Sequence, residues 1–69
     1  MEANYVVTGM TCGHCVAHVK EEVGELAGVT GVEVELEGGR MTITSDEPVP
    51  FEQVTEAVQE AGDYTVAQA

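Results

Sequence analysis

Positive charge is almost absent from this chain of 69 residues. Lys20 and Arg40 are its only basic residues, against thirteen acidic ones, and the formal net charge at pH 7 is -11. Such a charge repels the phosphates of nucleic acids and the head groups of anionic lipids, so both are excluded as partners. The excess of carboxylates favours solubility, and among ligands it favours metal cations or basic protein surfaces.

Long apolar segments are absent as well. No run approaches the roughly 18 residues that a membrane-spanning helix needs, and residues 1–5 contain no basic start of an export signal. We therefore expect a cytoplasmic protein without direct membrane insertion. A chain this short has room for one small core, so we expect a single domain over residues 1–69 and no deep pocket of the kind that enzymes use.

Cysteine is scarce, but its two copies are close together. Cys12 and Cys15 are separated only by Gly13 and His14. In a reducing compartment a C-x-x-C pair favours metal binding or redox chemistry over a structural disulfide. Closing so short a loop also stabilises a fold very little. The pair is the candidate functional site of the chain.

Apolar residues recur with helical spacing in two segments. The first, residues 13–27, carries Gly24 in its interior at a cost of about 1 kcal/mol relative to alanine. The second follows Pro50, which suits the first turn of a helix, and stops at Gly62. Each segment predicts an amphipathic helix that buries one apolar face. The predicted buried residues are Val16, Val19, Val23 and Leu26 in the first helix, and Phe51, Val54, Val58 and Ala61 in the second.

Four other segments predict strands. Residues 4–9 and 64–67 are short runs that include β-branched and aromatic residues. Beyond Gly28 the apolar spacing changes to two, and Gly38-Gly39 divides the alternating run into a hairpin with a two-residue turn. The hairpin residues predicted to face the core are Val32, Val34, Leu36, Met41 and Ile43. The element order predicts an α/β (α+β) sandwich of the ferredoxin-like βαββαβ type, an antiparallel four-stranded sheet with two helices on one face.

The first predicted helix begins between the two cysteines, and this placement bears on their chemistry. The unpaired N–H groups and the positive dipole end of the helix favour the thiolate form and so lower the pKa of each thiol. Two thiolates on an exposed loop suit a soft ion, Cu(I) above others, whereas a structural zinc site needs four ligands. Spare coordination positions let a second protein's thiolate enter during transfer. Zinc and cadmium bind the same donors, so the residues alone leave the metal open.

The run from Gly9 to Cys15, GMTCGHC, resembles the G-M-x-C-x-x-C motif of the heavy-metal-associated domain family. The resemblance covers nearly the whole chain, from about Tyr5 to Val66. Within the family the chain looks most like the small, free-standing bacterial copper chaperones. A single heavy-metal-associated domain over residues 1–69 is therefore expected.

The resemblance implies a carrier that is not an enzyme. By analogy with the family, Cys12 and Cys15 bind Cu(I), and Met10 tucks under the loop into the core. The implied partner is a similar metal-binding domain on a copper-exporting P-type ATPase, which receives the ion by ligand exchange. A copper-bridged homodimer is a second candidate assembly, because it needs only the exposed loop of each copy.

One position departs from the family pattern. The family often places an aromatic residue directly after alanine and glycine at the end of the second helix, but here Asp63 stands between Gly62 and Tyr64. Two interpretations of Tyr64 follow. It covers the metal loop, as the resemblance implies, or it is an ordinary strand residue.

Two histidines and one methionine are candidate accessory groups. His14 is either a third ligand or an exposed residue that binds nothing, and with His18 it has the i, i+4 spacing of paired helix ligands. Met10 is either a thioether ligand or core, and we favour core because methionine fills irregular gaps well.

Three alternatives to a free-standing chaperone stay open. A thiol-disulfide oxidoreductase also places C-x-x-C at the start of a helix, although no tryptophan precedes Cys12 and no strand suggests a cis-proline. The other two are an excised domain of a metal-transporting ATPase and a mercury-binding relative. The initiating Met1 and the missing export signal favour the free-standing cytoplasmic protein.

Overall fold

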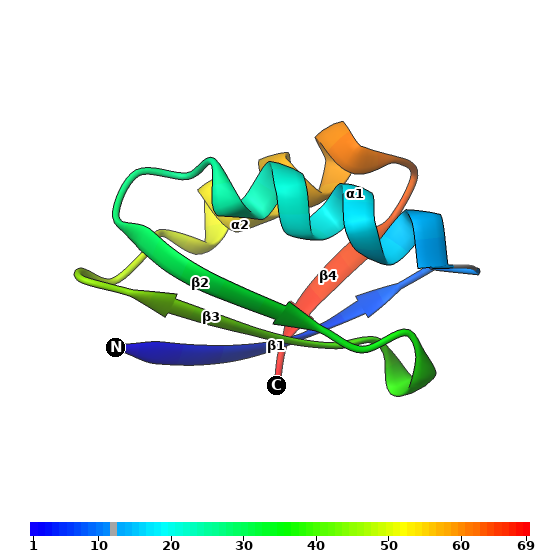
Figure 1. Cartoon of the computed structure of the whole chain (residues 1–69), viewed down its shortest axis with the longest axis horizontal. Coiled ribbons are helices and arrows are strands. Elements are labelled where there is room, and N and C mark those ends of the chain that lie inside the picture. Colours follow the sequence, from blue (N-terminus) through cyan, green and yellow to red (C-terminus); the bar gives the residue numbers. More distant parts are fainter. Residues whose placement is uncertain (12) are drawn as a thin grey trace.

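The computed structural model describes residues 1–11 and 13–69. Its elements follow the predicted βαββαβ order (Figure 1). They are β1 (Glu2–Thr8), α1 (Gly13–Gly24), β2 (Val29–Val34), a 3-10 turn η1 (Glu37–Gly39), β3 (Arg40–Ser45), α2 (Phe51–Ala61) and β4 (Thr65–Gln68).

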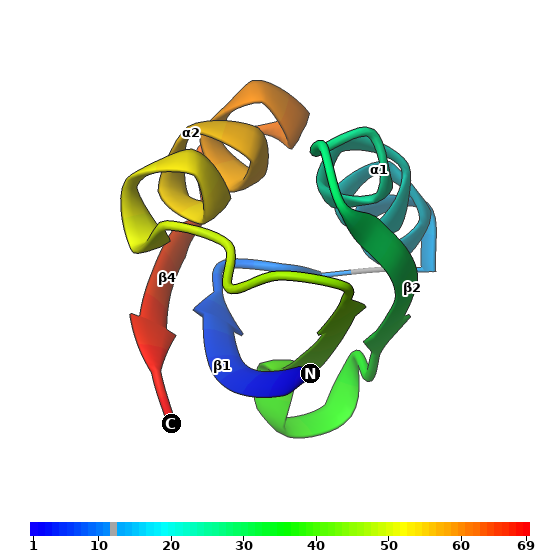
Figure 2. The same ribbon diagram turned by 90° about the vertical axis from the view of Figure 1, so that its left-hand side faces the viewer.

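The four strands form one antiparallel sheet in the order β2-β3-β1-β4. In the register, Tyr5 of β1 pairs with Met41 of β3 and Val7 pairs with Val66 of β4. Both helices cover the same face of this sheet, and the other face is open (Figure 2). The prediction of a ferredoxin-like sandwich is confirmed.

The core lies between the sheet and the helix pair. Strand alternation turns Tyr5 and Val7 inward, and the ring of Tyr5 stacks on Phe51 with 6.1 Å between centroids. Four valines, one pair from each helix, have no exposed surface at all. The buried apolar residues are Tyr5, Val7, Val19, Val23, Met41, Ile43, Val54, Ala57 and Val58. Each helix therefore buries most of the face that its apolar spacing predicted, with Ala57 added. Val16 is the exception, since it is only half-buried at the start of α1 and lies outside the core cluster.

The hairpin departs from the prediction at its turn. Strand β2 ends at Val34, so Leu36 lies beyond the sheet and is 44% exposed instead of buried. The turn is the three-residue η1 rather than a two-residue glycine turn, and Gly38 and Gly39 have φ angles of 79° and 68°. Alternation alone did not reveal this, because the end of the ladder depends on where β3 begins to pair.

The helix α1 is shorter than its apolar pattern. It ends at Gly24, and the chain then tightens through i→i−3 hydrogen bonds from Glu25 N–H to Glu22 C=O and from Leu26 N–H to Val23 C=O. Leu26 still packs against the core from this turn. The prediction that the helix reaches residue 27 is therefore wrong, although its last apolar contact is kept.

Candidate metal-binding site

The loop from β1 to α1 lies at the same end of the molecule as the loop from α2 to β4 (Figure 1). The helix α1 begins at Gly13, which places Cys15 in its first turn, where the backbone N–H groups have no partner within the helix. The Cys15 thiol is half-buried, and the hydroxyl of Thr11 lies 3.9 Å from its sulfur. The prediction for Cys12 falls outside the described residues.

Met10 anchors the approach to this loop. Its side chain is half-buried and packs against the core cluster. Gly9 before it has a φ of 107°, a left-handed conformation that a residue with a side chain rarely adopts. The backbone therefore turns sharply at the end of β1, and the Met10 side chain anchors the start of the loop to the core.

Tyr64 lies against two glycines from opposite ends of the sequence. A Cβ atom placed on Gly9 would lie 3.3 Å from Cδ1 of Tyr64, and one on Gly62 would lie 2.8 Å from Cε2 of the same ring. Tyr64 is half-buried, precedes β4 and packs against the core. The structure therefore places the ring beside the first residue of the Gly9–Cys15 run, and not within a strand.

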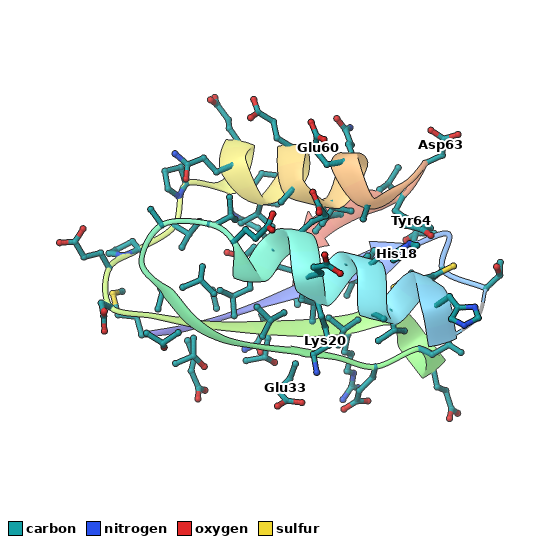
Figure 3. The ribbon with its side chains drawn as sticks, turned by 45° about the horizontal axis from the view of Figure 1, so that its top comes forward. His18, Lys20, Glu33, Glu60, Asp63 and Tyr64 are labelled. Atoms are coloured by element: carbon teal, nitrogen blue, oxygen red, sulfur yellow. The ribbon has the colours of Figure 1, made fainter. Side chains whose placement is uncertain are left out.

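The extra residue Asp63 is absorbed by a tight turn. The backbone N–H of Tyr64 donates to the C=O of Gly62 at 2.8 Å, a three-residue turn with exposed Asp63 at its apex. Figure 3 shows Asp63 pointing away from the molecule and Tyr64 pointing toward α1. With Asp63 in this turn, the ring of Tyr64 lies beside Gly9.

His14 and His18 are both exposed on α1. Within residues 1–11 and 13–69, one group of three or more potential metal-ligating side chains converges, and it contains neither histidine. That group is Glu21, Glu22 and Glu25, whose ligand atoms lie within 4.8 Å of one another. Exposed carboxylates gather in this way without a metal, so the group by itself assigns no site.

The packing of the Tyr64 ring against Gly9 and Gly62 was not predicted from the sequence. The signal was present as a glycine two residues before an aromatic residue and a second glycine before the cysteine loop. Only the fold shows that both glycines face one ring, because they are more than fifty positions apart in the chain.

The family model of the heavy-metal-associated domain matches residues 5–63. The chain belongs to the heavy-metal-associated domain family. The match contains the last four residues of β1, the loop, both helices, β2 and β3, and it stops at Asp63, the residue that departs from the family pattern.

Relatives of this heavy-metal-associated domain agree in sequence and in fold. The copper chaperone CopZ of Bacillus subtilis (strain 168) is 41% identical over 63 residues, which span 90% of this chain and 90% of the relative. A solved CopZ metallochaperone superposes with a TM-score of 0.87 at 31% identity, over 97% of this chain and 100% of the other. A solved copper-binding domain from HMA7, a P-type ATPase, has a TM-score of 0.86 at 26% identity over 99% and 92%.

The helices of the domain are short. Among the described residues, neither α1 nor α2 combines the length and the apolar character that a membrane-crossing helix requires.

Proposed function

We propose that residues 1–69 act as a cytoplasmic copper chaperone, a carrier and not an enzyme, that binds one Cu(I) through Cys12 and Cys15. The observation that carries the proposal is the position of Cys15 in the first turn of α1. The domain that contains it is similar to relatives named copper chaperones. Cu(I) is the cargo, and thiolates are the donors that this soft ion prefers.

The chemistry follows from the position of the loop. Each thiol loses its proton when it binds copper, and the start of α1 stabilises the negative charge that two thiolates and one Cu(I) leave on the site. Two ligands leave room for a third. During transfer a thiolate of the partner binds first, and then the two sulfurs of this chain leave in turn.

The proposed partner is the metal-binding domain of a copper-transporting P-type ATPase. It is supported by the solved domain of a P-type ATPase that shares this fold and is described as a copper-binding domain. The ring of Tyr64 lies beside Gly9, the first residue of the Gly9–Cys15 run. Because the loop projects from one end of the fold, a copper-bridged homodimer is a second loaded state, which gel filtration with and without Cu(I) distinguishes.

An anaerobic Cu(I) titration of the reduced protein against a competing chelator tests the proposal. We expect one tightly bound copper per chain, lost in Cys12→Ser and in Cys15→Ser. The matched control is His14→Ala with His18→Ala, which keeps the same stoichiometry if the thiolates alone hold the ion. Weak binding, or binding that survives both cysteine variants, would show that the cysteines are not the copper ligands. Thiol-disulfide chemistry would then be the favoured role of the pair. Competition with Zn²⁺, Cd²⁺ and Hg²⁺ checks the choice of metal.

A further inference from the structure

The two edges of the sheet differ in how well they are protected against pairing with another chain. Strand β2 forms one edge and β4 forms the other. The β2 edge carries the charged Glu33, is followed by Glu35, and is interrupted at Thr30, where the register with β3 shifts. Charged side chains and bulges are common means by which natural proteins prevent an edge strand from pairing with a strand of another molecule. The β2 edge is therefore protected.

Strand β4 has neither a charge nor a bulge. Its residues, Thr65–Gln68, include no proline and pair with β1 without a register shift. Asp63 is the single charged residue between Ala61 and Ala69, in a chain with thirteen acidic residues. Figure 2 shows β4 at the outer margin of the sheet, and within residues 1–11 and 13–69 no further strand lies beyond it. Of the two edges, β4 is thus the one that repels another acidic chain less.

The pairing of β4 with β1 fixes the direction of the main-chain groups of β4. The N–H of Ala69 donates to the C=O of Asn4 at 3.0 Å, at positions that continue the register between the two strands. In an antiparallel pair, hydrogen-bonded positions alternate with positions that are not bonded to the partner strand. The N–H and C=O groups of Val66 and Gln68 therefore point away from β1, toward the open edge of the sheet.

We propose that the β4 edge binds a second copy of this chain, strand against strand and antiparallel. With a two-fold axis beside Ala67, Val66 of one copy faces the partner's Gln68. These residues exchange both main-chain hydrogen bonds, because the outward groups occur at the same positions in both copies. The β4 edge is thus complementary to itself, and pairing joins the two sheets into one.

The side chains of β4 fit this pairing. Val66 is half-buried and packs against the core, so strand alternation places Ala67 on the open face of the sheet. There Ala67 lies opposite the partner's Ala67, and its methyl group fits the close spacing of a non-hydrogen-bonded pair, where Cα atoms are about 4.5 Å apart. A strand of 4 residues buries far less than the roughly 1,200 Å² of a stable complex, so the pairing is weak and reversible.

The β4 assembly is different from a copper-bridged dimer. Strand β4 begins directly after Tyr64, whose ring lies beside Gly9 at the cysteine loop. Antiparallel pairing of β4 therefore directs the loops of the two copies toward opposite ends of the joined sheet. The inference goes beyond the proposed function and does not depend on it, because no cysteine takes part in the pairing.

NMR of the reduced, metal-free protein at increasing concentration tests the pairing. Between about 0.05 and 2 mM protein, we expect the amides of Val66 and Gln68 to shift most and to exchange more slowly with solvent. Association should strengthen from about 0.05 to 0.5 M NaCl, because salt screens the charge of -11 on each copy. Gln68→Pro removes an outward N–H that β1 does not use, and is expected to abolish the concentration dependence while the fold is kept.

A charge exchange at Ala67 shows whether β4 contacts β4. Ala67→Glu and Ala67→Lys each place like charges opposite one another across the axis, so each variant alone is expected to associate about threefold more weakly. An equimolar mixture places opposite charges there and should restore the association. The matched control is Gln53→Glu with Gln53→Lys, at an exposed position of α2 that lines a hollow between the helices. Mixing the two control variants should produce no gain.

Three results would overturn the proposal. They are amide shifts that do not change with protein concentration, changes centred on β2 or on the helices, and a mixture of the two Ala67 variants that associates no better than either variant alone. A separate Cu(I) titration of the unmodified protein keeps the two ideas apart. A chain that binds no copper and still pairs through β4 would lose the proposed function and keep this inference.

Discussion

At the scale of single residues, the placement of Tyr64 depends on what its neighbours lack. Gly62 has an extended backbone, with φ at 162°, which any residue adopts. Its missing side chain is needed only because the ring of Tyr64 occupies that space. Gly9 is different, since its φ of 107° and the nearby ring both favour glycine. Gly9 and Gly62 therefore both leave space for the ring of Tyr64 at the loop, but only Gly9 is also required by its backbone conformation.

Gly62→Ala is expected to lower the free energy of unfolding by about 1–3 kcal/mol, because the new methyl group overlaps the ring and forces it to move. Urea unfolding followed by circular dichroism measures the change. In a Tyr64→Ala background the same substitution should cost less than about 0.5 kcal/mol, since the overlap is gone. Equal costs in the two backgrounds would mean that the ring is not what Gly62 accommodates.

At the scale of elements, the turn between β2 and β3 is fixed by its contact with β1. Gly39 is buried with a φ of 68°, and an added Cβ would overlap the main-chain carbonyl oxygen of Val7. Gly38 beside it has a φ of 79°, but an added Cβ there would meet nothing within 4 Å. Both glycines adopt the left-handed conformation, and only one of them also lies against another backbone.

This difference makes the pair a controlled comparison. Gly38→Ala is expected to destabilise the fold by about 1 kcal/mol, the cost of a left-handed alanine. Gly39→Ala should cost more than about 3 kcal/mol, because strand β1 must also move away from the turn. Thermal unfolding of both variants measures the difference. Similar losses at the two positions would show that the turn does not press on β1.

At the scale of the whole molecule, net charge opposes folding. The chain carries a charge of -11 within principal extents of 30 × 19 × 17 Å. The Debye length is about 30 Å at 0.01 M salt and about 10 Å at 0.1 M. In dilute buffer nearly every carboxylate therefore repels every other, whereas at higher salt only neighbours interact. Compactness and charge conflict most at low ionic strength.

Added salt is accordingly expected to stabilise the protein. Between about 0.01 and 0.5 M NaCl the midpoint of thermal unfolding should rise by several degrees, and KCl should act equally because the effect is screening. The variant Glu33→Gln, Glu35→Gln, Glu37→Gln should show a smaller rise, since it carries three fewer negative charges. A midpoint that falls with salt, or a rise that is unchanged in the variant, would contradict the repulsion argument.

The sequence by itself determined the order of the elements, the buried face of each helix and the start of α1 at the cysteine pair. These features are local, because helical and strand spacing and the effect of proline and glycine act over a few neighbouring residues. For the same reason the candidate site could be predicted at the level of its loop, and the elements on either side position Cys15 and Met10.

The tertiary structure decided what depends on residues far apart in the chain. Leu36 is exposed because β2 stops pairing with β3 before it. Position 39 needs glycine because the carbonyl oxygen of Val7 lies where a Cβ atom would be. The ring of Tyr64 lies at the loop because it packs beside Gly9. Glu22 of α1 and Glu60 of α2 likewise line the same two surface hollows only because the two helices pack side by side. No local spacing records such contacts, since packing brings these residues together only after the elements have formed.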